Sequence, residues 1–144
     1  MQSVRHTGYA VALLAGLSAC SGGPTAPAGA PTFPSAPYTA ATSESGVLTI
    51  AVRTSPQPPS RGTNDVQLTV TRTDDGSPVD GLTLDVVPIM PSMGHGTAMT
   101  AITPQGAGVY LVTGVYLYMP GTWELKTSFS GPIQDNAAPV LTVD

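Results

Sequence analysis

The sequence predicts an all-β protein: an immunoglobulin-like antiparallel β-sandwich of about seven strands, preceded by a signal peptide and a disordered Pro/Ala/Gly-rich tether. Two observations lead to this fold class. Apolar and polar residues alternate with a period of two in most segments after Gly46, and turn-forming residues separate these segments. No segment in that part of the chain has a helical period, which favours two packed sheets, with a closed barrel as the alternative.

Residues 1–19 have the pattern of a secretory signal peptide. Arg5 and His6 form a short basic region, and the apolar run from Tyr9 to Leu17 is too short for a permanent transmembrane helix. The run leads directly into Leu17-Ser-Ala-Cys20, which resembles a bacterial lipobox. The alternatives are an ordinary secretory signal or an uncleaved anchor, and each of these also places the domain outside the cytoplasm.

The lipobox resemblance implies that cleavage makes Cys20 the first residue of the mature chain and that this cysteine is acylated. Several acyl chains together anchor a protein stably, because each buried methylene contributes about 0.8 kcal/mol. Ser21 stands where an aspartate would indicate retention at the inner membrane. We therefore expect a lipid anchor in the bacterial cell envelope, at the outer membrane and facing the periplasm.

Residues 20–43 form the predicted tether, and residues 44–144 form the predicted domain. The tether consists mainly of Gly, Pro, Ala, Ser and Thr with almost no charge, so it cannot bury enough apolar area to offset its ordering entropy. The roughly 100 residues that follow are enough for one small domain.

The strands of this domain are predicted from the alternation and from the turn residues between them. They cover residues 48–53, 66–71, 82–86, 97–103, 108–119, 122–129 and 139–143. In the longest segment the alternation puts Val109, Leu111, Val115, Leu117 and Met119 on one face, and Tyr110, Val112, Tyr116 and Tyr118 on the other. Trp123 lies on the buried face of the next segment, and its bulk predicts that it anchors the core.

Charge and cysteine content exclude some function classes. Without Arg5, the mature side chains sum to four bases and nine acids, a net charge of −5, which argues against a nucleic-acid partner. One cysteine cannot form an intramolecular disulfide. An enzyme is not expected either, because no nucleophile elbow accompanies His95 and the paired carboxylates Asp74-Asp75 are explained by the turn that follows them.

Several fragments in the domain occur in an order that is similar to the YtkA-like and FixH-like domains of bacterial envelope proteins. The resemblance covers about residues 64–143. The fragments that carry it are Asn64, Asp75-Gly76-Ser77-Pro78-Val79, Met90-Pro91-Ser92-Met93-Gly94-His95, Gly108-Val109-Tyr110 and Met119-Pro120-Gly121-Thr122-Trp123-Glu124-Leu125. The resemblance implies a β-sandwich lipoprotein. Some members of these families are associated with copper handling, cation pumps or cytochrome oxidase assembly.

The segment Met90-Pro-Ser-Met-Gly-His-Gly96 carries the candidate site. Thioethers and imidazole are soft to borderline ligands that suit copper in an oxidising compartment, so Met90, Met93 and His95 form the candidate metal-binding set. Met119 is a weaker candidate, and Met99 is a further one. The alternative is purely structural: methionine fills irregular gaps in cores, and Gly and His make the turn.

The sequence thus leaves two functional hypotheses. The first is a lipid-anchored envelope accessory protein that binds or passes copper through Met90, Met93 and His95. The second is a metal-free β-sandwich that recognises an envelope protein or has a structural role there.

Overall fold

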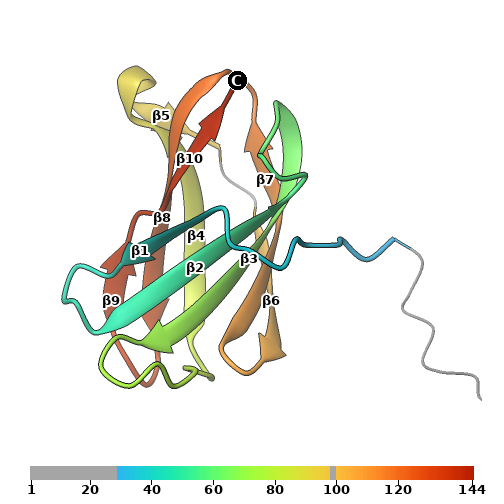
Figure 1. Cartoon of the computed structure of the whole chain (residues 1–144). Helices are drawn as coiled ribbons and strands as arrows, with labels where there is room; N and C mark the ends of the chain where they lie inside the picture. The colour runs from blue at the N-terminus through green and yellow to red at the C-terminus, as the bar shows by residue number, and fades with distance from the viewer. Residues whose placement is uncertain (1–28, 98–99) are drawn as a thin grey trace, which may run out of the picture. The chain divides into compact units, whose positions relative to one another are not determined.

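The computed structural model describes residues 29–97 and 100–144, and residues 31–144 form a compact unit. Within this unit, ten strands and one short 3₁₀ turn follow one another (Figure 1). The strands are β1 (Thr39–Thr42), β2 (Leu48–Ser55), β3 (Gly62–Arg72), β4 (Thr83–Met90), β5 (His95–Gly96), β6 (Ala101–Gly106), β7 (Val109–Leu117), β8 (Gly121–Ser130), β9 (Asp135–Ala137) and β10 (Val140–Val143); the turn is η1 (Pro91–Met93). In these ranges no helix is long and apolar enough to cross a membrane.

The strands form two antiparallel sheets, which confirms the predicted β-sandwich. The first sheet has the order β1-β2-β3-β7-β6, and the second has the order β10-β8-β4-β5 with β9 also paired to β8. Every strand pairing is antiparallel. The chain crosses from one sheet to the other between β3 and β4, between β5 and β6, and between β7 and β8.

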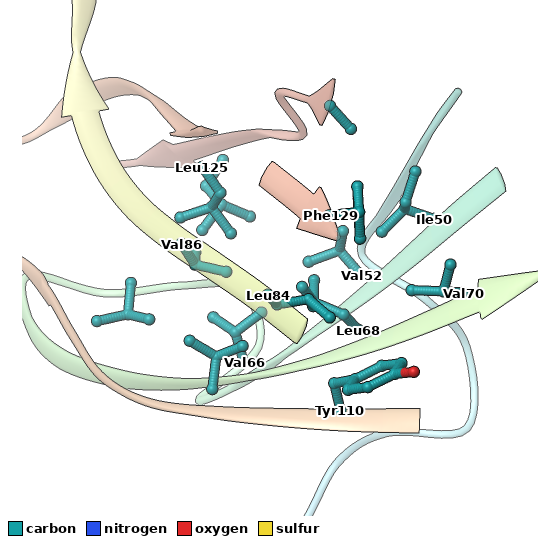
Figure 2. Close-up of a cluster of buried hydrophobic side chains, with 14 of the residues drawn as sticks. Ile50, Val52, Val66, Leu68, Val70, Leu84, Val86, Tyr110, Leu125 and Phe129 are labelled. Atoms are coloured by element: carbon teal, nitrogen blue, oxygen red, sulfur yellow. The ribbon is translucent and has the colours of Figure 1, made fainter. Parts of the chain in front are cut away.

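Alternating side chains from both sheets fill the space between them, as the period-two pattern predicted. On β2 every second residue is buried, and the same alternation continues through β3 and β8. Figure 2 shows part of this core, with labelled side chains of both sheets directed toward one another: Ile50, Val52, Val66, Leu68, Val70, Leu84, Val86, Tyr110, Leu125 and Phe129. Trp123 has no exposed surface and belongs to this buried cluster.

The predicted faces of β7 are wrong because a β-bulge interrupts the strand. Asn64 of β3 pairs with Val115, whereas Val66 pairs with Val112, so β7 contains one residue more than its partner across this step. Gly114 lies there with a φ of 78°, a conformation that glycine adopts without strain. After the bulge the alternation shifts by one residue, and the buried residues are Tyr110, Val112, Val115 and Leu117. Tyr116 is consequently on the exposed side.

The first sheet begins inside the segment that was predicted to be tether. β1 pairs with β2 over four residues, and the Tyr38 hydroxyl hydrogen-bonds to the backbone of Thr142 in β10. The guanidinium of Arg53 donates two hydrogen bonds to the Ser35 carbonyl, at 3.0 and 3.2 Å. The chain is therefore joined to the domain from about Ser35. Cys20, the signal segment and residues 20–28 of the predicted tether lie outside the described residues.

Candidate functional site

The Met/His segment is a tight hairpin at one end of β4. Pro91 begins the 3₁₀ turn, and Gly94 ends it in the left-handed conformation with a φ of 68°. The Gly94 amide donates to the carbonyls of Met90 and Pro91, at 3.2 and 3.3 Å. The chain then returns as β5, where His95 pairs with Met90. We call residues 90–96 the Met/His hairpin.

Gly96 is required because the returning chain approaches β4 very closely. A Cβ atom on Gly96 would lie only 2.1 Å from the Pro88 carbonyl oxygen, whereas a Cβ on Gly94 would meet no atom within 4 Å. The next amide, that of Thr97, donates to the same Pro88 carbonyl at 2.9 Å. The position of His95 is therefore set by the turn that ends at Gly94 before it and by the close approach of Gly96 after it.

The hairpin separates its two thioethers into different environments. Met90 is 3% exposed, and its Cε lies 3.3 Å from where a Cβ would stand on Gly121, so the side chain fills the core beside the start of β8. Met93, on the turn, is 48% exposed. Met90 thus has the position of a core residue that fills a gap between the sheets, and Met93 has the position of an accessible donor.

His95 is exposed, and its ring contacts Tyr118, which lies in the connection between β7 and β8. The Tyr118 hydroxyl and His95 Nδ1 are 3.0 Å apart, and the two rings are almost parallel, with an interplanar angle of 5° and centroids 6.2 Å apart. Tyr116 stacks beside Tyr118 at 6.3 Å, and its side chain is 49% exposed. The aromatic row at this end of the sandwich thus runs from His95 through Tyr118 to Tyr116.

Trp123 connects this surface to the core. The Tyr118 ring meets the Trp123 ring edge to face, with centroids 5.1 Å apart and an interplanar angle of 83°. The Trp123 indole N–H donates to the carbonyl of Met119 at 3.0 Å, while the Met119 side chain packs, partly buried, against the core. Met119 thus contacts Trp123 through its backbone carbonyl, whereas its side chain packs against the core.

Of the predicted site residues, Met93 and His95 are both exposed, and they lie two positions apart on the Met/His hairpin. Met90 and Met119 are directed to the core, and Met99 and Cys20 lie outside the described residues. Among residues 29–97 and 100–144, no three His, Cys, Asp or Glu side chains are grouped so that they could hold a metal ion. Sequence reasoning did not identify Tyr118 as a site residue, because it lies 23 positions from His95 and only the fold brings the two together.

The opposite end of the sandwich contains a polar hollow of about 510 Å³ near the end of β8. Asp135 lies there and accepts hydrogen bonds from the amide and hydroxyl of Ser45 and from the amide of Asn136. Partial burial raises the pKa of Asp135, but the hydroxyls of Ser43 and Ser45 and these backbone amides outweigh it and lower the pKa to about 2. The carboxylate ties the β1–β2 turn to β9, which is a structural role.

Comparison with known proteins identifies the family. The model of the YtkA-like family matches residues 42–128, which is more than half of the chain and includes the whole Met/His hairpin. The chain belongs to the YtkA-like family. No curated protein and no solved structure shows significant similarity to it. The YtkA-like match begins earlier and ends earlier than the predicted resemblance over residues 64–143, and the similarity to FixH-like domains stays a prediction.

Proposed function

We propose that this YtkA-like protein is a lipid-anchored accessory protein of the bacterial cell envelope that binds Cu(I) through the Met93 thioether and the His95 imidazole. The observation that carries the proposal is the pairing of one exposed thioether with one exposed imidazole, two residues apart on a hairpin fixed by glycine. Soft sulfur and borderline nitrogen donors are the ligands that copper takes where thiolates are absent.

The arrangement around His95 also supports a ligand role. Metal-binding histidines commonly use their second ring nitrogen in a hydrogen bond that fixes the ring. His95 has such a contact, between Nδ1 and the Tyr118 hydroxyl. Met93 and His95 would hold Cu(I), which accepts few ligands and needs no carboxylate, and both residues would remain open to a partner that delivers or removes the ion.

The proposal omits Met90 and Met119 from the ligand set. Met90 is buried against Gly121, so recruiting its sulfur would leave a gap in the core between the two sheets. Met119 is partly buried and packs on the same core. The proposed site is therefore a two-donor surface site, suited to transfer rather than to permanent storage of the ion.

A Cu(I) titration against a competing chelator tests this proposal. The Met93→Leu, His95→Ala double variant is expected to lose the tight binding of the wild-type protein. Met90→Leu is the matched control, because it removes the buried thioether at similar volume and is expected to keep the wild-type affinity. Equal Cu(I) affinity in the wild type and the double variant would refute copper binding at the hairpin.

A second candidate function is a metal-free interaction module, with binding rather than catalysis as its activity. The observation that favours it is the exposure of Met93 and Tyr116 beside His95 and Tyr118, because methionine and aromatic residues are enriched in protein interfaces. A pull-down from envelope extract tests it. This function is supported if, in the absence of copper, the wild type and the double variant both enrich the same partner. It is opposed if the wild-type domain enriches no protein over the tether segment alone.

The proposed location depends on Cys20. The lipobox resemblance supports a lipoprotein, and Ser21 in place of an aspartate after Cys20 favours the outer membrane, facing the periplasm. Metabolic labelling with a fatty acid is expected to mark the wild-type protein and not Cys20→Ala, which should also leave the membrane fraction. A Cys20→Ala protein that is still acylated and membrane-bound would contradict the lipid anchor.

A further inference from the structure

Tyr118 lies between the Met/His hairpin and the core residue Trp123. We propose that Tyr118 is a positioning residue: it occupies Nδ1 of His95 and thereby leaves Nε2 as the nitrogen that faces a metal ion. This inference rests on the proposed copper function, and it adds which atom of His95 binds and which residue decides it.

The distance between Tyr118 and His95 limits where a metal can bind. The Tyr118 oxygen is 3.0 Å from Nδ1, which is hydrogen-bond distance. A metal–imidazole bond is about 2.0 Å long and uses the same lone-pair direction. An ion at Nδ1 would therefore have to displace the tyrosine hydroxyl, whereas an ion at Nε2 leaves that contact intact with Nδ1–H as donor.

The core fixes Tyr118, and Tyr118 in turn fixes His95. The edge-to-face contact at 5.1 Å holds the Tyr118 ring against Trp123, which has no exposed surface. The Trp123 indole N–H bonds the carbonyl of Met119, the residue directly after Tyr118, so the backbone is held as well. Displacing Tyr118 would disturb these contacts. Trp123 thus holds Tyr118 in place, and Tyr118 orients the exposed imidazole.

Tyr118→Phe removes only the hydroxyl and keeps a ring that can pack on Trp123. Tyr116→Phe is the matched control, because it makes the same change on the neighbouring ring, and no hydrogen bond of the Tyr116 hydroxyl occurs among the described residues. Loss of a residue that orients a metal ligand typically lowers metal affinity 10- to 100-fold. We expect that loss for Tyr118→Phe and wild-type affinity for Tyr116→Phe.

The experiment uses the mature protein in detergent, labelled with ¹⁵N-histidine. The sequence has two histidines, and cleavage before Cys20 removes His6, so His95 is expected to give the remaining histidine signals. Without metal, the wild type is expected to show contacts between the His95 and Tyr118 rings and one ring orientation, and Tyr118→Phe is expected to show more than one. With Ag(I) as a redox-inert probe for Cu(I), the coordination shift is expected on Nε2, while Nδ1 stays protonated.

The outcomes separate the inference from the proposed function. Coordination through Nδ1, or a Tyr118→Phe protein with unchanged ring orientation and unchanged Ag(I) affinity, would overturn the positioning role and leave copper binding standing. If the wild type binds no metal, the proposed function fails. In that case, a His95 ring that keeps one orientation in the wild type and not in Tyr118→Phe still supports positioning by the tyrosine.

Discussion

The different roles of the two hairpin thioethers can be measured as a difference in stability. Met90 is 3% exposed and fills the space beside Gly121, so Met90→Ala removes buried atoms and leaves a cavity between the sheets. Truncation of a buried methionine to alanine costs about 2–5 kcal/mol. Met93 is 48% exposed, so Met93→Ala is expected to change the free energy of unfolding by no more than about 0.5 kcal/mol.

Urea denaturation followed by tryptophan fluorescence measures both changes. The chain has a single tryptophan, Trp123, which is fully buried, so the signal reports the unfolding of the core. Met90→Ala is expected to lower the urea midpoint markedly without changing the slope. Equal midpoints for Met90→Ala and Met93→Ala would refute the assignment of Met90 to the core and would return its sulfur to the list of candidate ligands.

Two further predictions concern the hairpin and the opposite end of the sandwich. Gly96→Ala is expected to destabilise the domain by about 2–3 kcal/mol, because the added Cβ would meet the Pro88 oxygen. Gly94→Ala is expected to cost only about 1 kcal/mol, through its backbone angle alone. Urea denaturation measures both losses of stability, and a larger loss for Gly94→Ala would contradict the close approach of Gly96 to Pro88. Asp135 has a pKa lowered from 3.8 to about 2, so its stabilising contribution is complete above about pH 4 and is lost as the pH falls toward 2. Asp135→Asn should therefore lower the urea midpoint at pH 7 more than at pH 2, and an equal loss at both values would contradict this role.

The strands could be predicted from local sequence because a half-buried strand has a period of two. The alternation of β2, β3 and β8 identified their buried residues directly. β1 could not be predicted in this way, since Thr39–Thr42 has no large apolar residue, and its pairing depends on the neighbouring edge of β2. The bulge at Gly114 was also missed, because one extra residue reverses the faces without changing the composition.

The local part of the candidate site could be predicted from the sequence, and its contacts between distant residues could not. Met93 and His95 are close in sequence, so their shared hairpin could be inferred from Pro91 and Gly94. Tyr118 is distant in sequence, and its contact with His95 depends on how the two sheets pack. Burial of Met90 was left open by the sequence, because a methionine at the end of a strand can face either the core or solvent.

The Cu(I) titration with its matched pair of thioether variants tests the central claim most directly. Copper binding through Met93 and His95 predicts weaker binding for Met93→Leu and wild-type binding for Met90→Leu, measured under the same competing chelator. The two leucine variants make the same chemical change at positions that differ in exposure, 48% against 3%. If Met93→Leu binds Cu(I) as tightly as the wild-type protein does, the Met/His hairpin is not the copper site.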